Sequence, residues 1–102
     1  GVGDGRLPPH EFGLSTSYPN PFRSETRIGY TLAAPASVEI AIFDLRGRLI
    51  KKVLDANLPT GAHTAVWDGR DADGLLQANG IYFYRIRSGE KVVAAKRIVL
   101  LR

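Results

Sequence analysis

The sequence contains no cysteine, so disulfide bonds and metal sites that need thiolates are excluded. It has only two histidines, His10 near the start and His63 within an expected strand, and we do not expect them to meet in the fold. A zinc site or a histidine-dependent catalytic triad is therefore not expected. No apolar run approaches the about 18 residues of a membrane-spanning helix, so we also expect no membrane span.

The excess of one sign of charge is small as well. The formal net charge is +4 over 102 residues, and lysine and arginine are scattered along the chain rather than grouped. A scattered excess of this size is typical of a soluble domain and does not indicate a nucleic-acid partner. The chain also has no motif that would bring a nucleophile, a base and an acid together. We therefore expect a protein without enzymatic activity.

Short segments of alternating apolar and polar residues fill most of the chain. Apolar residues take every second position within them, as in half-buried antiparallel strands, and no segment has the helical period. The six prolines and most of the eleven glycines fall between these segments, where they mark turns or irregular stretches. The expected strands cover residues 27–32, 37–43, 48–55, 62–67, 81–88 and 92–101, with a short edge strand around Phe12 and Leu14.

This pattern predicts an all-β fold, namely a seven-stranded antiparallel β-sandwich of the immunoglobulin or fibronectin type. The domain is expected to span residues 12–102. Residues 1–11, which contain three glycines and two adjacent prolines, are expected to form a linker. The side chains predicted to face the core are Ile28, Tyr30 and Leu32, then Val38, Ile40 and Ile42, and finally Tyr82, Tyr84 and Ile86.

The stretch of residues 67–86 combines the most core material with the most specific turn residues. Trp67 is the only tryptophan and is expected to be the largest buried side chain. Gly74 and Gly80 are expected in turns, because glycine accepts the backbone angles that turns require. Tyr82 follows at the start of the next strand, where immunoglobulin-like domains place a tyrosine corner.

Residues 18–22 carry two prolines within five residues. Pro19 and Pro21 have no backbone N–H to donate, so this segment cannot be a central strand and should be extended and locked. Tyr18 and Phe22, at its two ends, are expected to close one end of the core by packing.

Three aspartates, Asp68, Asp71 and Asp73, lie close together in the loop after the only tryptophan. Carboxylates at this spacing before Gly74 could bind a hard cation such as Ca²⁺ through oxygen ligands. Arg70, however, stands where a ligand is expected, and no glutamate follows at the closing position. The alternative is a series of turns in which the aspartate side chains accept loop amide hydrogens. No other cofactor is expected.

The last expected strand contains adjacent Lys96 and Arg97, so regular alternation would turn one of them inward. A bulge at this point would resolve the conflict.

A docking surface is expected on the outward face of the sheet that the strands 37–43, 81–88 and 92–101 would share. Ala41 lies on this face among aromatic and arginine side chains. An apolar patch rimmed by arginines suits a protein partner. The candidate docking residues are Phe43, Phe83, Arg85, Arg87, Lys96 and Arg97.

The order of these motifs resembles two related families. One is the type A C-terminal sorting domain of proteins exported by the type IX secretion system. The other is the immunoglobulin-like domain of flagellar hook-capping proteins. The resemblance covers residues 12–102 and is carried by Tyr18-Pro19-Asn20-Pro21-Phe22, residues 38–44 with Gly47, Gly61 and His63, Trp67-Asp68-Gly69, Gly74, and residues 80–85.

The sorting-domain resemblance implies a non-catalytic export signal that closes a larger secreted protein. Its implied partners are the outer-membrane secretion machinery and the upstream cargo domains of the same chain. Its implied location is outside the outer membrane, at the cell surface or secreted.

Two alternatives stay open at this point. The first is a carbohydrate-binding or structural accessory module of an extracellular enzyme, for which Tyr18, Phe43 and Phe83 are the candidate aromatic residues. The second is an assembly domain of the hook-capping type.

Overall fold

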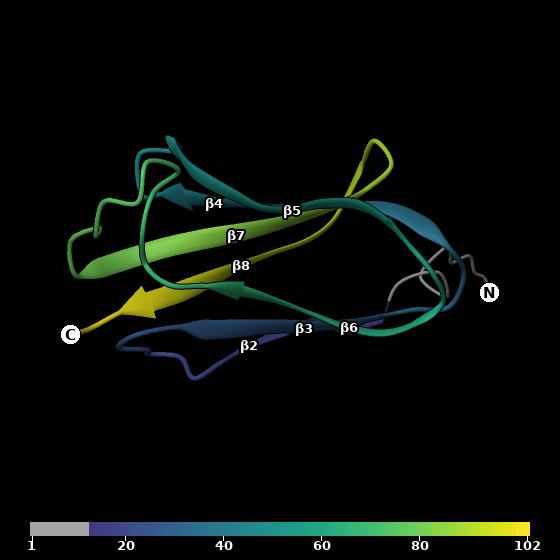
Figure 1. Cartoon of the computed structure of the whole chain (residues 1–102), viewed down its shortest axis with the longest axis horizontal. Coiled ribbons are helices and arrows are strands. Elements are labelled where there is room, and N and C mark those ends of the chain that lie inside the picture. Colours follow the sequence, from purple (N-terminus) through teal and green to yellow (C-terminus); the bar gives the residue numbers. More distant parts are fainter. Residues whose placement is uncertain (1–12) are drawn as a thin grey trace.

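The computed structural model describes residues 13–102, which form two antiparallel sheets packed face to face (Figure 1). The three-stranded sheet has the order β2-β3-β6 and the four-stranded sheet the order β5-β4-β7-β8. The strands are β2 (Thr16–Tyr18), β3 (Thr26–Leu32), β4 (Ala36–Asp44), β5 (Leu49–Leu58), β6 (Gly61–Trp67), β7 (Gly80–Ser88) and β8 (Lys91–Leu100). The prediction of a seven-stranded antiparallel sandwich is confirmed.

The start of the fold differs from the predicted edge strand. Phe12 and the linker 1–11 with His10 lie outside the described residues. Leu14 precedes β2 and is exposed, because the next residue takes the inward position. That residue, Ser15, is buried, and its hydroxyl lies 2.9 Å from the Tyr84 hydroxyl in a hydrogen bond. The edge strand begins at Thr16 instead.

Three connections cross from one sheet to the other, and the remaining strand pairs are neighbours within a sheet. The β4–β5 turn follows the predicted pattern: the Gly47 amide donates to the Asp44 carbonyl at 3.0 Å. The Asp44 side chain also accepts the amide hydrogens of Arg46 and Arg48, each at 2.9 Å. These charge-assisted bonds lower the pKa of Asp44, chiefly through the Arg48 amide.

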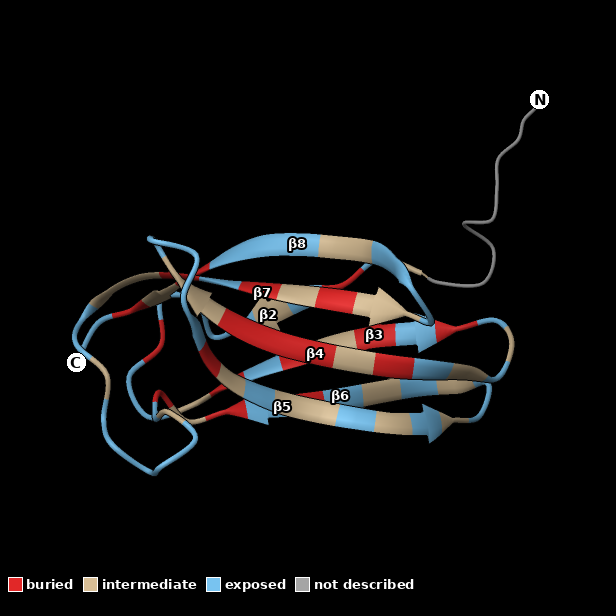
Figure 2. Cartoon of the chain, turned by 90° about the horizontal axis from the view of Figure 1, so that it is seen from above, coloured by how far each residue is buried: buried red, intermediate tan, exposed pale blue. Residues whose placement is uncertain are grey.

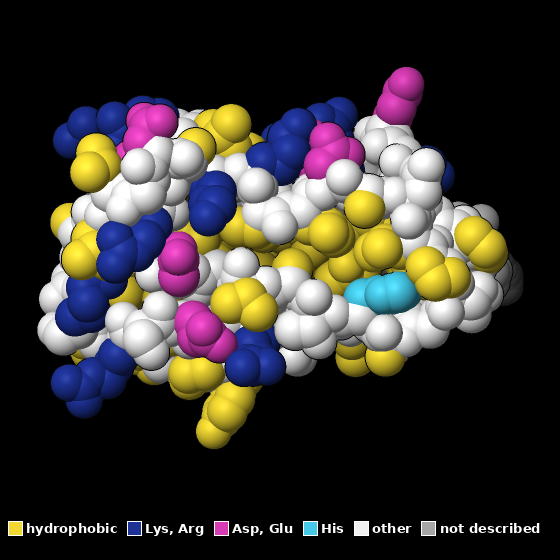
Figure 3. All heavy atoms as spheres, in the orientation of Figure 1, with side chains coloured by type: hydrophobic (Ala, Val, Ile, Leu, Met, Phe, Trp, Pro, Cys, Tyr) yellow, Lys and Arg dark blue, Asp and Glu magenta, His cyan; other side chains and the backbone are white. Residues whose placement is uncertain are grey.

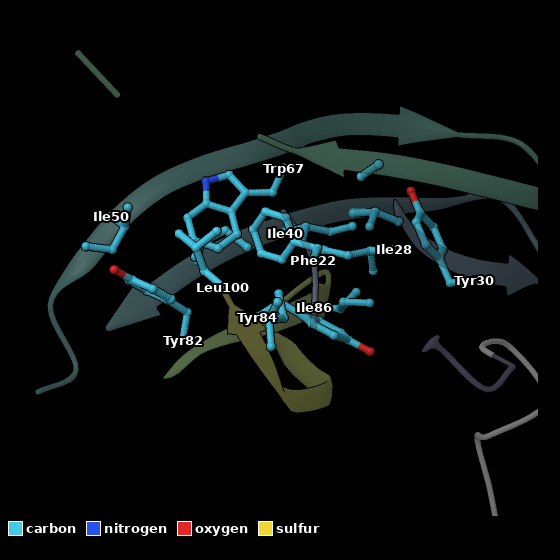
Figure 4. Close-up of a cluster of buried hydrophobic side chains, with 14 of the residues drawn as sticks. Phe22, Ile28, Tyr30, Ile40, Ile50, Trp67, Tyr82, Tyr84, Ile86 and Leu100 are labelled. Atoms are coloured by element: carbon cyan, nitrogen blue, oxygen red, sulfur yellow. The ribbon is translucent and has the colours of Figure 1, made fainter. Parts of the chain in front are cut away.

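The core lies between the sheets and is built from the inward positions of each strand, where burial alternates along the chain (Figure 2). All nine side chains predicted to face inward are buried. Trp67 is fully buried, its ring packing against Phe22 and Tyr82 with centroid distances of 5.5 and 5.1 Å (Figure 4). Its indole N–H donates to the Arg70 carbonyl at 2.9 Å, so burial leaves no donor unpaired.

The predicted tyrosine corner is present. The Tyr82 hydroxyl donates to the carbonyl of Ala78, four residues upstream, at 2.6 Å. The bond ties the start of β7 to the loop that precedes it, as in other immunoglobulin-like domains.

Residues 18–22 have both proline peptide bonds in the cis form. Phe22 is buried in the core, as predicted, but Tyr18 is 78% exposed, so the prediction that it closes the core is wrong. Tyr18 ends β2 opposite Arg27. Because the neighbouring Ile28 faces inward, this register position places Tyr18 on the outward face of the three-stranded sheet.

The predicted bulge at Lys96 and Arg97 is also wrong. The irregularity in β8 lies at Val93, between the pairs Ile86–Ala94 and Arg87–Val92. Beyond it the register is regular, so Lys96 lies opposite the inward-facing Tyr84. The lysine stem reaches the rim of the sandwich, where its ammonium donates to the Ser15 carbonyl, and the strand needs no bulge there.

Candidate functional site

The outer face of the four-stranded sheet, the side opposite Tyr82, Tyr84 and Ile86, is the candidate site. Cross-strand pairing places Leu49, Phe43, Phe83 and Arg97 in one row across its four strands. Ile81 and Val99 form the next pair toward the end of the sheet. This half of the outer face is therefore mainly apolar, and Phe83 and Leu49 are its exposed hydrophobic side chains.

The other half of the outer face is charged and centres on Glu39. Its carboxylate lies 3.1 Å from the Lys52 ammonium, 3.5 Å from the Arg85 guanidinium and 3.8 Å from that of Arg87. Lys52 also pairs with Asp55 at 3.4 Å. The Lys52 hydrogen bond is the main cause that lowers the pKa of Glu39, and the same contact raises the pKa of Lys52. Three cations thus share one central carboxylate, which leaves the face positive.

Arginine side chains cover the centre of the outer face rather than rim it. The Arg85 guanidinium carbon lies 4.7 Å from the centre of the Phe43 ring, in a cation–π contact. Ala41 faces outward as predicted but is only 2% exposed, because its pairing partner is Arg85. The Nε atoms of Arg85 and Arg87 are buried and have no hydrogen-bond acceptor among the described residues.

Five of the six predicted docking residues therefore share the outer face. The exception is Lys96, which belongs to the inward-facing set of β8 and reaches the N-terminal segment of the other sheet. The sequence contained the information needed to place Lys96 with the inward set, because Lys96 is an even number of positions from the apolar Ile98 and Leu100.

The aspartate loop forms a series of turns. Asp68 accepts the Arg70 amide at 3.1 Å, and Asp71 accepts the amides of Asp73 and Leu75, each at 2.9 Å. Within residues 13–102, no three acidic or histidine side chains lie close enough together to hold a metal ion. The turn interpretation accounts for these bonds, and the calcium interpretation has no supporting contact. Gly74, with φ of 85°, stands in the loop as predicted, whereas Gly80, with φ of 153°, is the first residue of β7 and pairs with Leu100 instead of lying in a turn.

Two asparagines that hold the end of β8 were not predicted in that role. Asn20 accepts the Val99 amide at 2.9 Å and donates to the Arg97 carbonyl at 3.0 Å. Asn79 accepts the Arg102 amide at 3.0 Å and donates to its carbonyl at 3.2 Å. A side-chain amide offers an acceptor and a donor group, as a peptide unit does. Asn20 therefore pairs with the end of β8 as a neighbouring strand would, and Asn79 holds Arg102 just after the strand in the same way. The signal available in the sequence was asparagine next to proline or glycine.

Phe22 completes the same contact through its backbone. Its amide donates to the Val99 carbonyl and its carbonyl accepts the Leu101 amide, both at 2.9 Å. Phe22 and Leu100 thereby form an isolated parallel bridge at the edge of β8. The segment 20–22 thus occupies the outer edge of the last strand.

The three candidate aromatic residues of the carbohydrate-binding alternative do not share a surface. Tyr18 lies on the three-stranded sheet, whereas Phe43 and Phe83 pair on the outer face of the four-stranded sheet. A single flat platform of all three is therefore absent from the described part of the chain. None of residues 13–102 forms a helix long and apolar enough to cross a membrane.

Known structures with this fold include two large proteins of Porphyromonas gingivalis. The chain matches latent, dimeric PorU with a TM-score of 0.76 and 22% identity, covering 98% of this chain and 10% of that one. It matches PorZ, an essential surface component of the type-IX secretion system, with a TM-score of 0.57 and 26% identity over 86% of this chain and 11% of that one. The first likeness shows the shared fold.

A curated relative supplies closer sequence similarity. The basal-body rod modification protein FlgD of Salmonella typhimurium is 38% identical over 60 residues, which are 58% of this chain and 26% of that protein. The chain thus spans about a quarter of that relative's length. Both resemblances stated from the motifs are confirmed by these matches. Because residues 19–91 match the FlgD Ig-like domain family, the chain belongs to that family.

Proposed function

We propose that this domain is a non-catalytic export and sorting signal of a larger secreted protein, which it also holds at the cell surface. The observation that carries the proposal is the likeness to segments of PorU and PorZ, each covering about a tenth of a much longer chain. PorZ is described as a surface component of the type-IX secretion system. A signal of this kind acts through a surface and needs no active site.

The outer face of the four-stranded sheet is the proposed docking surface for the outer-membrane secretion machinery. Phe83 and Leu49 offer exposed apolar area in one half of this face, and Arg97 stands beside Phe83 in the same row. Aromatic and arginine side chains are enriched in protein–protein interfaces relative to the rest of the surface. The neighbouring lysine and arginines favour an acidic partner surface by charge complementarity.

A reporter protein fused to residues 1–102 tests the proposal in a bacterium with the type-IX system. Phe83→Glu and Arg97→Glu should each reduce the exported fraction at least tenfold, because both change the contact surface without entering the core. Arg27→Glu is the matched control, since Arg27 is exposed on the opposite sheet and its one ion pair within residues 13–102 is with Glu25, two positions earlier. Unchanged export of both outer-face variants, with both folded, would refute this docking surface.

Deletion of residues 92–102 is less informative than these substitutions. Ile98 and Leu100 of β8 are fully buried in the core, so the deletion removes part of the core together with any signal. A loss of export would then have two causes. The substitutions separate them because circular dichroism can establish that each variant still folds.

A second candidate is an assembly domain of the hook-capping type, which the family match and the FlgD relative favour. The assembly role is tested by a chimera of Salmonella FlgD in which this domain replaces the matched segment. Restored swimming motility would support an assembly role. A stable, folded chimera without motility would favour the export role.

A further inference from the structure

Three of the four edge strands of the sandwich are protected against pairing with another chain. β2 is only three residues long. β5 carries Lys51 and Lys52 and has two register shifts against β4. β8 has a bulge at Val93, and its final residues are paired by Asn20 and Phe22. Short length, lysines, bulges and covering segments are the means by which native sheets avoid edge-to-edge association.

The fourth edge strand, β6, has none of these protections. Its seven residues include no lysine, arginine, aspartate or glutamate, and they pair with β3 in unbroken register. Its other edge forms no backbone hydrogen bond with any part of residues 13–102. The outward side chains Ala62, Thr64 and Val66 are exposed and neutral. Among the described residues, therefore, none pairs with the backbone groups of this edge.

The inward side chains of β5 and β6 leave an apolar seam beside this edge. Leu54, Ala56 and Leu58 of β5 are partly buried, and His63 and Ala65 lie below them on β6. Figure 3 shows hydrophobic side chains in a hollowed strip on this side of the molecule, next to the histidine. Two alanines and a histidine fill the side of the core less completely than large apolar residues would.

An open hollow of about 450 Å³ lies where β4 begins and β5 ends. Leu58 lines both the seam and this hollow, and Pro59, Pro35 and Ala36 form other parts of its wall. The apolar side chains that an extended segment along β6 would meet are therefore those of the seam, and Leu58 is the residue that the seam shares with this hollow.

We propose that the free edge of β6 binds an extended segment of another polypeptide as an added strand. The residues of this added strand that pair with β6 are uncharged. Its apolar side chains stand at alternate positions and enter the seam. Seven residues of β6 give pairing over about 23 Å at about 3.3 Å per residue. Main-chain hydrogen bonds would supply affinity, and the seam would select the alternating apolar side chains.

A second copy of this chain fits the edge less well. The inward residues of β6, including Trp67, already face their own core and cannot enter the seam of another molecule. Each copy also carries a net charge of +4. A separate segment that brings its own apolar side chains avoids both difficulties.

A synthetic peptide that alternates valine and threonine, with terminal lysines for solubility, is the probe. Its matched control is the same peptide with alternate backbone amides N-methylated, which cannot form the strand ladder. Amide exchange measured by NMR on the whole chain should slow at least tenfold along the outer edge of β6 with the probe and stay unchanged with the control. Protection confined to β8 or β5, or equal effects of both peptides, would overturn the proposal.

Two substitutions sharpen the test. Ala56→Lys puts a charge into the seam and should weaken binding of the probe at least tenfold, whereas Ala95→Lys adds the same charge to the opposite face of the same sheet and should leave binding unchanged. Thermal unfolding establishes that both variants fold. Protection of β6 that appears without peptide and grows with protein concentration would overturn the assignment in favour of self-pairing.

Discussion

Asn20 accepts the amide hydrogen of Val99, 79 residues later in the chain, at 2.9 Å. The same side chain donates to the Arg97 carbonyl, so one residue near the start of the fold satisfies two backbone groups of its last strand. These two bonds occupy backbone groups on the outer edge of β8, which has no neighbouring strand on that side. Asn20 therefore couples the beginning of the domain to its end. The integrity of β8 therefore depends on residues 18–22.

Asn20→Ala should lower the free energy of unfolding by about 1–2 kcal/mol, because two hydrogen bonds to the edge of β8 are lost. Chemical denaturation measures the change. Asn57→Ala is the control, since the exposed Asn57 side chain makes no hydrogen bond within the described residues. Equal effects of the two substitutions would contradict the role assigned to Asn20.

Tyr82→Phe should destabilise the domain by about 1–2 kcal/mol, because it leaves the Ala78 carbonyl without its 2.6 Å bond while the ring stays in place. The same substitution at Tyr18, whose side chain is exposed, should change stability by less than about 0.5 kcal/mol. Thermal unfolding of the two variants provides the comparison. If Tyr82→Phe left the stability of the domain unchanged, the hydrogen bond of the tyrosine corner would contribute little to it.

Gly69→Ala should destabilise the domain, because Gly69 has φ of 78° and an added Cβ would lie 3.1 Å from the Arg102 guanidinium and 3.4 Å from Leu100. A cost of about 1–2 kcal/mol is expected for a side chain in the left-handed region. Gly29→Ala is the matched control, since nothing lies within 4 Å of its added Cβ. That variant should be neutral or stabilised by up to about 1 kcal/mol, as alanine is favoured over glycine in a strand. The opposite order would refute this account of Gly69.

The stability of the domain should fall on acidification partly through Glu39. The Lys52 hydrogen bond lowers the pKa of Glu39 below its ordinary value of 4.5 in the folded state. A carboxylate with a lowered folded pKa contributes stability above the unfolded pKa, and this contribution is lost as the pH falls through the folded pKa. The stability loss below pH 4.5 should therefore be smaller in Glu39→Gln than in the parent chain.

Denaturant unfolding between pH 2 and pH 6 measures this difference. Glu90→Gln serves as the control, because Glu90 lies in the β7–β8 turn and forms no ion pair within the part of the chain that the structure covers. Parallel pH profiles for the parent and Glu39→Gln would show that the charge cluster on the outer face does not contribute.

The sequence by itself determined the sandwich and its core. Alternation of apolar residues identified the inward sets of β3, β4 and β7, because a strand has a period of two and one buried face. Turn residues such as Gly47 and the tyrosine at position 82 predicted local contacts that span only a few residues. Such features depend on neighbours in the chain, so the sequence alone contains the information needed to predict them.

Only the tertiary structure decided the contacts between distant residues. Alternation along β8 already assigns Lys96 to the inward set, but its contact with Ser15 depends on how β8 aligns with the other sheet, which no local pattern encodes. The pairing of Asn20 with Val99 and the sharing of Glu39 by three cations likewise require strand order and register. The free edge of β6 became visible for the same reason, because an edge exists only once the order of the strands in a sheet is known.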